Sequence, residues 1–159
     1  MRIELPAFPV EGGCVCGTAR YRLAAPPLST YACHCRDCQR AAGAFELSMP
    51  IRRETFRHTA GALACRDKTA DSGRTVRMFR CARCGTRLWN QPLAVPGLLV
   101  VKPGTLDAPG WALPVGNIWT DSRLPWVAID PGLVNFPRQP PRREPLYDAW
   151  AAAAAPMPG

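Results

Sequence analysis

The sequence has no long run of apolar residues. Its first residues, MRIELPAFPVEGG, hold no apolar stretch of the length that a signal peptide needs. No segment approaches the about 20 apolar residues of a membrane-spanning helix. From these two absences we expect a cytoplasmic protein without a membrane partner, in a compartment where thiols stay reduced.

Lysine is almost absent, because Lys68 and Lys102 are the only lysines among 20 basic residues. The formal net charge of +8 therefore comes from arginines, which are scattered along the chain. Aromatic residues do not alternate with them in the pattern typical of nucleic-acid-binding segments. We therefore expect no specific nucleic-acid partner, whereas a modest positive field would suit a small anionic substrate.

Internal repeats are absent too, and the 18 prolines and 13 glycines argue against a bundle of long helices. Short alternating segments between turns favour a small, mainly β fold. Strands are expected within residues 13–23, 44–51, 56–67, 75–89 and 97–106, with a turn at Gly61 and a hairpin turn at 71–74.

A chain of 159 residues suits a single domain with a core of its own. Residues 1–12 are expected to be a lead-in, and residues 13–137 the domain itself. Residues 138–159 are expected to form a tail rich in proline and alanine, ending in a short helix or a frayed segment.

Cysteine, in contrast, is abundant, and the eight cysteines are clustered. In a reducing compartment, clustered cysteines favour metal binding or catalysis over disulfides. Two pairs are each followed by a glycine: Cys14 and Cys16 before Gly17, and Cys81 and Cys84 before Gly85. Alternate residues of a strand face one side, and glycine permits a tight turn after a C-x-x-C motif. The two pairs together predict a closed Cys₄ shell around a structural zinc ion. A redox role would require a βαβ pattern, which the sequence lacks.

A second group lies in CHCRDCQR, residues 33–40, which holds Cys33, Cys35 and Cys38. We expect three thiolates on one ion with an open fourth position, the arrangement of catalytic zinc sites. His34 stands between two ligands and is expected to point away from the ion as a packing residue. Cys65 has no neighbouring ligand and is expected to be a small buried hydrophobe, although a Cys₄ site that uses Cys65 stays arithmetically open.

Five segments occur in a specific order: GGCVCGTARY, CHCRDCQRAAGAF, FRCARCGTRLW, KPGTLDAP and IWTDSRLPW. Together they resemble the glutathione-dependent formaldehyde-activating enzyme family, whose domain is shared with centromere protein V, from about Gly12 to Pro137. The resemblance implies a β-tent fold with two zinc ions per chain. It implies a structural zinc on Cys14, Cys16, Cys81 and Cys84, and a catalytic zinc on Cys33, Cys35 and Cys38. Cys65 has no counterpart in the family, and Asn117 stands where members often carry a histidine.

Three thiolates leave a zinc ion electron-rich, which suits a sulfur nucleophile better than hydrolysis by bound water. With the resemblance, this predicts a carbon–sulfur lyase or synthase that forms or breaks a glutathione–aldehyde adduct such as S-(hydroxymethyl)glutathione. Glutathione would be the cosubstrate. The alternatives are a related enzyme that acts on a different glutathione conjugate and a non-catalytic zinc-binding module.

Further candidates lie near the ligands in sequence. The arginines at positions 36, 40, 83 and 87 could offset thiolate charge or hold glutathione carboxylates, or they could be solvated surface residues. Phe45, Trp119 and Trp126 could line the site or belong to the core.

Overall fold

Residues 2–70 and 73–154 are described by the computed structural model of the chain. Within these ranges the chain forms eleven strands, two α-helices and four short 3₁₀ helices. The mainly β, single-domain fold class expected from the sequence is confirmed. In the same ranges, no helix is both long and apolar enough to cross a membrane.

Three strands form a small antiparallel sheet in the order β1-β2-β5. Their bounds are Val10–Gly13 for β1, Arg20–Leu23 for β2 and Phe56–Ala60 for β5. The expected strand at 13–23 is therefore wrong in its first half, because the chain turns between β1 and β2. Gly17 makes this turn with φ of 77°, and its amide donates to the Cys14 carbonyl oxygen at 2.9 Å.

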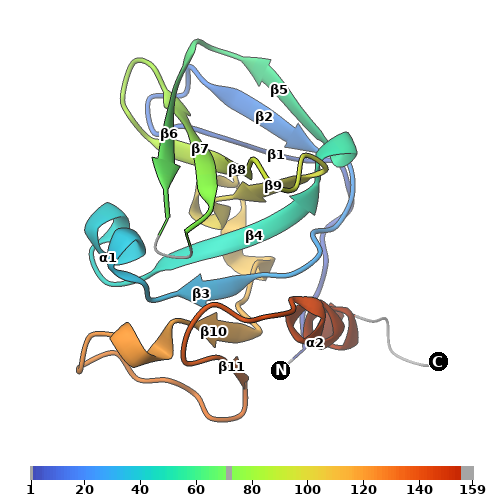
Figure 1. Ribbon diagram of the computed structural model, residues 1–159. Helices are drawn as coiled ribbons and strands as arrows, with labels where there is room; N and C mark the ends of the chain where they lie inside the picture. Colours follow the sequence, from blue (N-terminus) through green and yellow to red (C-terminus); the bar gives the residue numbers. More distant parts are fainter. Residues whose placement is uncertain (1, 71–72, 155–159) are drawn as a thin grey trace, which may run out of the picture.

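The other eight strands form one sheet in the order β11-β10-β3-β4-β9-β8-β7-β6 (Figure 1). Their bounds are β3 Tyr31–Cys33, β4 Glu46–Arg52, β6 Leu63–Thr69, β7 Thr75–Cys81, β8 Arg87–Pro92, β9 Leu98–Val101, β10 Gly116–Ile118 and β11 Val134–Asn135. Strands β6 to β9 form an antiparallel meander, and β4 pairs antiparallel with both β9 and β3. The parallel pairs lie at the other end of this sheet, where β10 pairs with β3 and with β11.

The chain passes from the small sheet to the large one at Gly61, where the sequence predicts a turn. Gly61 has φ of 86°, and a Cβ atom at this position would lie 2.3 Å from the carbonyl oxygen of Thr18. Only glycine fits such a close approach in this backbone conformation. The expected hairpin turn at 71–74 falls partly on residues 71–72, which lie outside the described residues; β6 and β7 on either side pair antiparallel.

The main core lies between the two sheets. Tyr21 and Leu23 of β2 and Leu99 of β9 are completely buried there. The ring of Trp89 lies 4.6 Å from that of Phe56 and 5.2 Å from that of Phe79, measured between centroids. Such aromatic contacts add to the stabilisation that burial of apolar area provides.

Two α-helices flank the large sheet, α1 at Arg36–Ala42 and α2 at Glu144–Ala154 (Figure 1). The 3₁₀ helices are η1 Arg53–Thr55, η2 Pro103–Thr105, η3 Pro109–Trp111 and η4 Thr120–Ser122. The segment 138–159, expected to be a tail, contains α2, and the helix packs into the fold. Its Leu146 lies against Tyr31 and Ile118, and its Trp150 packs with Ile3 and Val115. Residues 155–159 of the expected tail lie outside the described residues.

Candidate functional site

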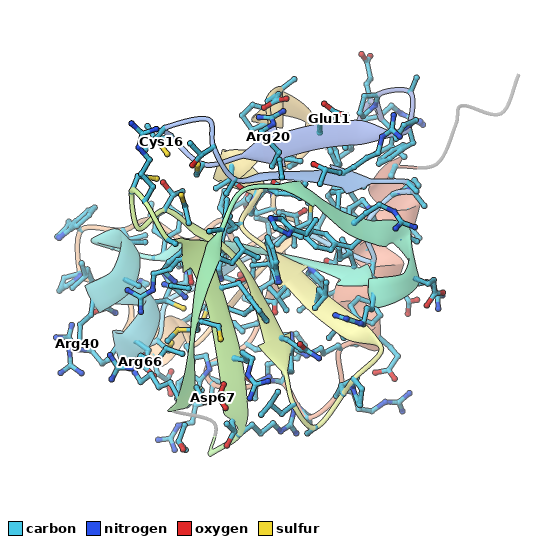
Figure 2. The ribbon with its side chains drawn as sticks, turned by 90° about the horizontal axis from the view of Figure 1, so that it is seen from above. Glu11, Cys16, Arg20, Arg40, Arg66 and Asp67 are labelled. Atoms are coloured by element: carbon cyan, nitrogen blue, oxygen red, sulfur yellow. The ribbon has the colours of Figure 1, made fainter. Side chains whose placement is uncertain are left out.

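Four cysteines from two distant turns form the first cluster, and their Sγ atoms all lie within 4.8 Å of one another. Cys14 and Cys16 belong to the turn between β1 and β2, whereas Cys81 ends β7 and Cys84 lies in the turn that leads to β8. Figure 2 shows Cys16 on its loop at the edge of the molecule. The cluster joins the small sheet to the large one, and it brings together the four cysteines that the sequence assigned to one ion.

The two turns repeat the same backbone geometry. The amide of Gly17 donates to the Cys14 carbonyl at 2.9 Å, and the amide of Gly85 donates to the Cys81 carbonyl at 3.0 Å. Both glycines have positive φ, 77° and 76°. The glycine that follows each pair is thus required by the turn, as the sequence predicts, but the C-x-C pair lies in this turn and not in a strand.

Local hydrogen bonds favour the thiolate form of two cysteines of this cluster, Cys14 and Cys84. Burial acts to raise the pKa of Cys14, but the Ala19 amide and the sulfurs of Cys16 and Cys81 lower that pKa to about 7. The side chain and the backbone of Thr86 lower the pKa of the Cys84 thiol to about 5. Thr18 acts to lower the pKa of the Cys16 thiol, but desolvation and the side chains of Cys14 and Cys84 raise that pKa overall. Four close sulfurs, two of them with stabilised thiolates, match the donor set of a closed tetrahedral zinc site.

Three cysteines at the junction of β3 and α1 form the second cluster. Cys33 ends β3, Cys35 caps the N-terminus of α1, and Cys38 lies in the first turn of that helix. The amide of Cys38 donates to the Cys35 Sγ at 3.4 Å. Their sulfurs lie within 4.8 Å of one another, and no fourth His, Cys, Asp or Glu of residues 2–70 and 73–154 joins the group. The structure therefore brings together the three predicted residues and leaves one side of the cluster without a protein ligand.

The three thiols shift one another's pKa values in opposite directions. The Cys33 side chain, with that of Cys38, lowers the pKa of Cys35 to about 2, whereas the Cys35 side chain raises the pKa of Cys33 to about 12. The neighbouring thiols, Cys33 first, also raise the pKa of Cys38. Crowded thiols therefore cannot all ionise unless a cation neutralises them, and sulfur ligands are those that zinc prefers.

His34 and Cys65 take no part in either cluster. The His34 side chain is buried, its Nε2 lies 3.0 Å from Oδ1 of Asn117, and its ring lies 5.3 Å from that of Phe45. Asn117 in turn donates to the Asn135 side chain at 2.8 Å. The prediction that Cys65 is buried is wrong, because this residue is exposed on β6, the edge strand of the large sheet.

A pocket of about 370 Å³ lies beside the second cluster, and Cys33, Cys35 and Cys38 line it. Six basic side chains also line it: Arg40, Lys68, Arg80, Arg87, Lys102 and Arg143. Among the described residues of the lining, only Asp37 and Glu46 carry a carboxylate. The pocket therefore has an excess of positive charge around a group of sulfur ligands, which suits an anionic ligand.

Glu46 is the residue that connects the cations to the sulfurs. Its carboxylate is buried at the start of β4, 2.9 Å from Nζ of Lys102 and 3.0 Å from a guanidinium nitrogen of Arg87. The same carboxylate accepts a weak hydrogen bond from the Cys38 Sγ at 3.6 Å. At the rim of the pocket, Lys68 of β6 forms an ion pair with Asp37 of α1. Both carboxylates are thus neutralised by protein cations.

The arginines near the ligands divide into two groups. Arg40 and Arg87 line the pocket, and Figure 2 shows Arg40 projecting from α1. Arg36 instead donates to the side chain of Gln39, and Arg83 lies in the turn of the first cluster, outside the pocket lining. Sequence proximity therefore identified two of the four as pocket residues.

Of the three aromatic candidates, only Trp119 lines the pocket. Trp119 follows β10 directly and adopts a left-handed conformation with φ of 61° and ψ of 39°. This conformation is unusual for a bulky residue and costs about 1–3 kcal/mol, which the surrounding structure must offset. Phe45 packs against His34, and Trp126 is 72% exposed away from the pocket lining.

Most of the other lining residues were missed by the sequence analysis, among them Tyr31, Glu46, Lys102 and Arg143. One signal was available, because both lysines of an arginine-rich chain line the same pocket. No local pattern marks the other three, since each lies far from the motifs or within a strand.

Fold and site together define a mainly β domain with two cysteine clusters that can hold metal ions. The family model of the glutathione-dependent formaldehyde-activating enzyme matches residues 9–122, and the chain belongs to this family. The resemblance noted in the sequence is thereby confirmed. The match ends before β11 and α2, so the segment that supplies Arg143 lies beyond it.

Comparison with solved structures finds a crystal structure of a Rhodobacter sphaeroides protein with 19% sequence identity and a TM-score of 0.49. The match covers 79% of this chain and 98% of that chain. No curated protein matches the sequence.

Proposed function

We propose that the protein is a zinc-dependent carbon–sulfur lyase or synthase that forms or breaks a glutathione–aldehyde adduct such as S-(hydroxymethyl)glutathione. The observation that carries the proposal is the three-cysteine cluster in the wall of a cationic pocket. Membership of the family supports glutathione as the thiol and formaldehyde as the first aldehyde to test.

In the forward direction, the thiolate sulfur of glutathione adds to the carbonyl carbon, and the oxygen takes up a proton to give the hemithioacetal. In the reverse direction, the hydroxyl proton leaves and the carbon–sulfur bond breaks. A zinc ion held by Cys33, Cys35 and Cys38 would supply a fourth ligand position that favours loss of the thiol proton.

The chain itself supplies position and charge. Lys102 and Arg87 hold the Glu46 carboxylate beside Cys38, so the carboxylate is fixed and its charge is compensated. Ile118 and Trp119 give the same wall an apolar part that limits water. The guanidinium groups of Arg40, Arg80 and Arg143 form no ion pair with a described carboxylate, so they attract the negative charge of glutathione.

The test is exchange NMR between free formaldehyde and its glutathione adduct, with and without zinc-loaded protein. Rates are needed because the uncatalysed addition is already fast, so an end-point assay cannot separate it from catalysis. We expect acceleration by the wild-type protein and by Cys65→Ser, and none by Cys35→Ser. Equal exchange rates with and without the wild-type protein would rule the formaldehyde reaction out.

A second candidate is the same chemistry on another glutathione conjugate. Val76, Met78 and Val100 line the pocket together with the cations, so a larger apolar group would find contacts there. A panel of S-substituted glutathiones, assayed for release of free thiol, separates the two candidates. A non-catalytic zinc-binding module would require no pocket beside the three-cysteine cluster, and the pocket therefore favours an enzyme.

A further inference from the structure

The segment after the family match contributes two side chains to the pocket. Gln139 and Arg143 lie in its lining together with Cys33, although the family match ends at residue 122. The segment returns to the large sheet here, since Leu146 packs against Tyr31. This part of the pocket therefore belongs to the particular chain and not to the motifs that define the family.

Arg143 is held in place but is not neutralised. Its guanidinium carbon lies 5.6 Å from the centre of the Tyr31 ring, and one of its nitrogens donates to the Tyr31 hydroxyl at 2.5 Å. None of the described carboxylates forms an ion pair with it, and Glu144 pairs with Arg142 instead, at 3.5 Å. The ring of Tyr31 fixes the guanidinium by a cation–π contact while its charge stays available.

Gln139 carries an unused donor at the same pocket. Its Nε2 atom is buried and has no hydrogen-bond acceptor in the part of the chain that the structure describes. A buried donor without a partner costs free energy, so native proteins rarely keep one unless a ligand or water satisfies it. One wall of the pocket thus presents the Gln139 amide without an acceptor and the Arg143 guanidinium without an ion pair to a described carboxylate. A ligand with negatively charged acceptor oxygens would satisfy both groups.

We propose that Arg143 and Gln139 form a carboxylate-binding subsite, with Tyr31 as the positioning residue for Arg143. The planar guanidinium matches a carboxylate in a paired geometry that lysine cannot reproduce. The subsite lies beside Cys33, so the carboxylate belongs to the same molecule as the sulfur that reaches the cluster. The inference rests on the proposed function for the thiol; it adds that the C-terminal segment selects thiols that carry a carboxylate.

The test uses the zinc-loaded full chain and S-methylglutathione, which keeps both carboxylates but has no free thiol. Isothermal titration should show that the wild-type protein binds this probe at least about tenfold more tightly than its diethyl ester. Arg143→Met should remove most of that difference, and Arg143→Lys should restore only part of it. The matched control is Arg142→Met, because Arg142 is the adjacent, exposed arginine, and it should bind both probes as the wild type does.

Gln139→Glu sharpens the test, because it places a carboxylate where the ligand carboxylate is expected. This variant should weaken binding of S-methylglutathione and leave binding of the diethyl ester nearly unchanged. A merely structural role for Arg143 predicts that the stability of the protein falls while the preference for the free acid over the ester stays.

Three results would overturn the subsite: no binding of S-methylglutathione, equal binding of acid and ester by the wild type, or a preference unchanged in Arg143→Met, Arg143→Lys and Gln139→Glu. These outcomes are independent of the exchange assay. If exchange is absent but the preference depends on Arg143, the proposed function fails and the subsite stands. If exchange occurs with no such dependence, the subsite fails alone.

Discussion

The two cysteine clusters use the same ligand atom in different surroundings. The first takes its sulfurs from two turns, and Cys16 and Cys81, whose sulfurs lie 3.8 Å apart, are 65 residues apart in sequence. The second takes its sulfurs from Cys33, Cys35 and Cys38, at one junction between a strand and a helix. The first joins two sheets, whereas the second lines a pocket of cations. The difference teaches that the position of a cluster, more than its chemistry, decides whether a metal would hold the fold or meet a substrate.

The largest expected effect comes from breaking the first cluster. Cys81→Ser removes a buried sulfur from the cluster that links the two sheets, and a structural zinc ion held there would contribute its binding free energy to folding. We expect the free energy of unfolding to fall by more than about 3 kcal/mol, with loss of soluble protein. Denaturant unfolding of the purified protein measures this, with Cys65→Ser, which belongs to neither cluster, as the control. Unfolding curves that coincide for Cys81→Ser and Cys65→Ser would contradict a structural role.

Breaking the second cluster should instead leave the fold intact. Cys35→Ser changes a residue at one local junction, so we expect a folded protein in which elemental analysis finds one zinc ion where the wild type holds two. Activity should fall at least about a hundredfold, since even changes around metal ligands reduce activity by 10 to 100-fold. Circular dichroism tests the fold, and zinc analysis tests the count. A protein that unfolds as readily as Cys81→Ser would erase the distinction between the clusters.

The spacing of the cysteines predicted which sulfurs lie together. Within each C-x-C or C-x-x-C pair the cysteines are local in sequence, so a few backbone angles determine the geometry of the pair. The family resemblance was confirmed over residues 9–122, a stretch that includes all seven clustered cysteines. Helix α1 was missed, as its seven residues have too little pattern to mark it. Apart from the two lysines, the walls of the pocket could not be foreseen, because Glu46 and Arg143 reach it only through the pairing of distant strands and the packing of α2.

Substitution of the two pocket lysines should change stability by smaller and unequal amounts, because Lys102 is buried whereas Lys68 is more exposed. Lys102→Met leaves the buried Glu46 with Arg87 as its one remaining ion-pair partner among the described residues, and we expect a loss of about 1–3 kcal/mol in stability. Lys68→Met breaks only the more exposed pair with Asp37, which is worth less than about 1 kcal/mol. Urea denaturation of both variants makes the comparison. Equal destabilisation would show that the Glu46 network does not depend on Lys102.

The smallest effect is expected with nucleic acid. Much of the basic charge near the second cluster faces the pocket, and the remaining arginines are dispersed. Any retention of DNA should therefore fall steeply with salt and show no sequence preference. Fluorescence anisotropy with two unrelated duplexes, at low and moderate salt, measures this. A complex that survives moderate salt would instead favour a binding module.

The sheet order of this protein has a consequence for how the molecule assembles. Strands β6 to β9 are neighbours in sequence, so this meander can form from local contacts, whereas β10 must find β3 across most of the chain, where Asn117 pairs with Ala32. Non-local pairing is slow, and proteins open locally in cooperative units that often coincide with a motif such as this meander. The pocket lies between these two parts of the molecule. Arg80 and Arg87 come from the meander, whereas Cys33 and Arg143 come from the part that contains β3 and β10. Partial unfolding would therefore abolish ligand binding while the meander and the core behind it persist, and hydrogen exchange should show two levels of protection along this one sheet.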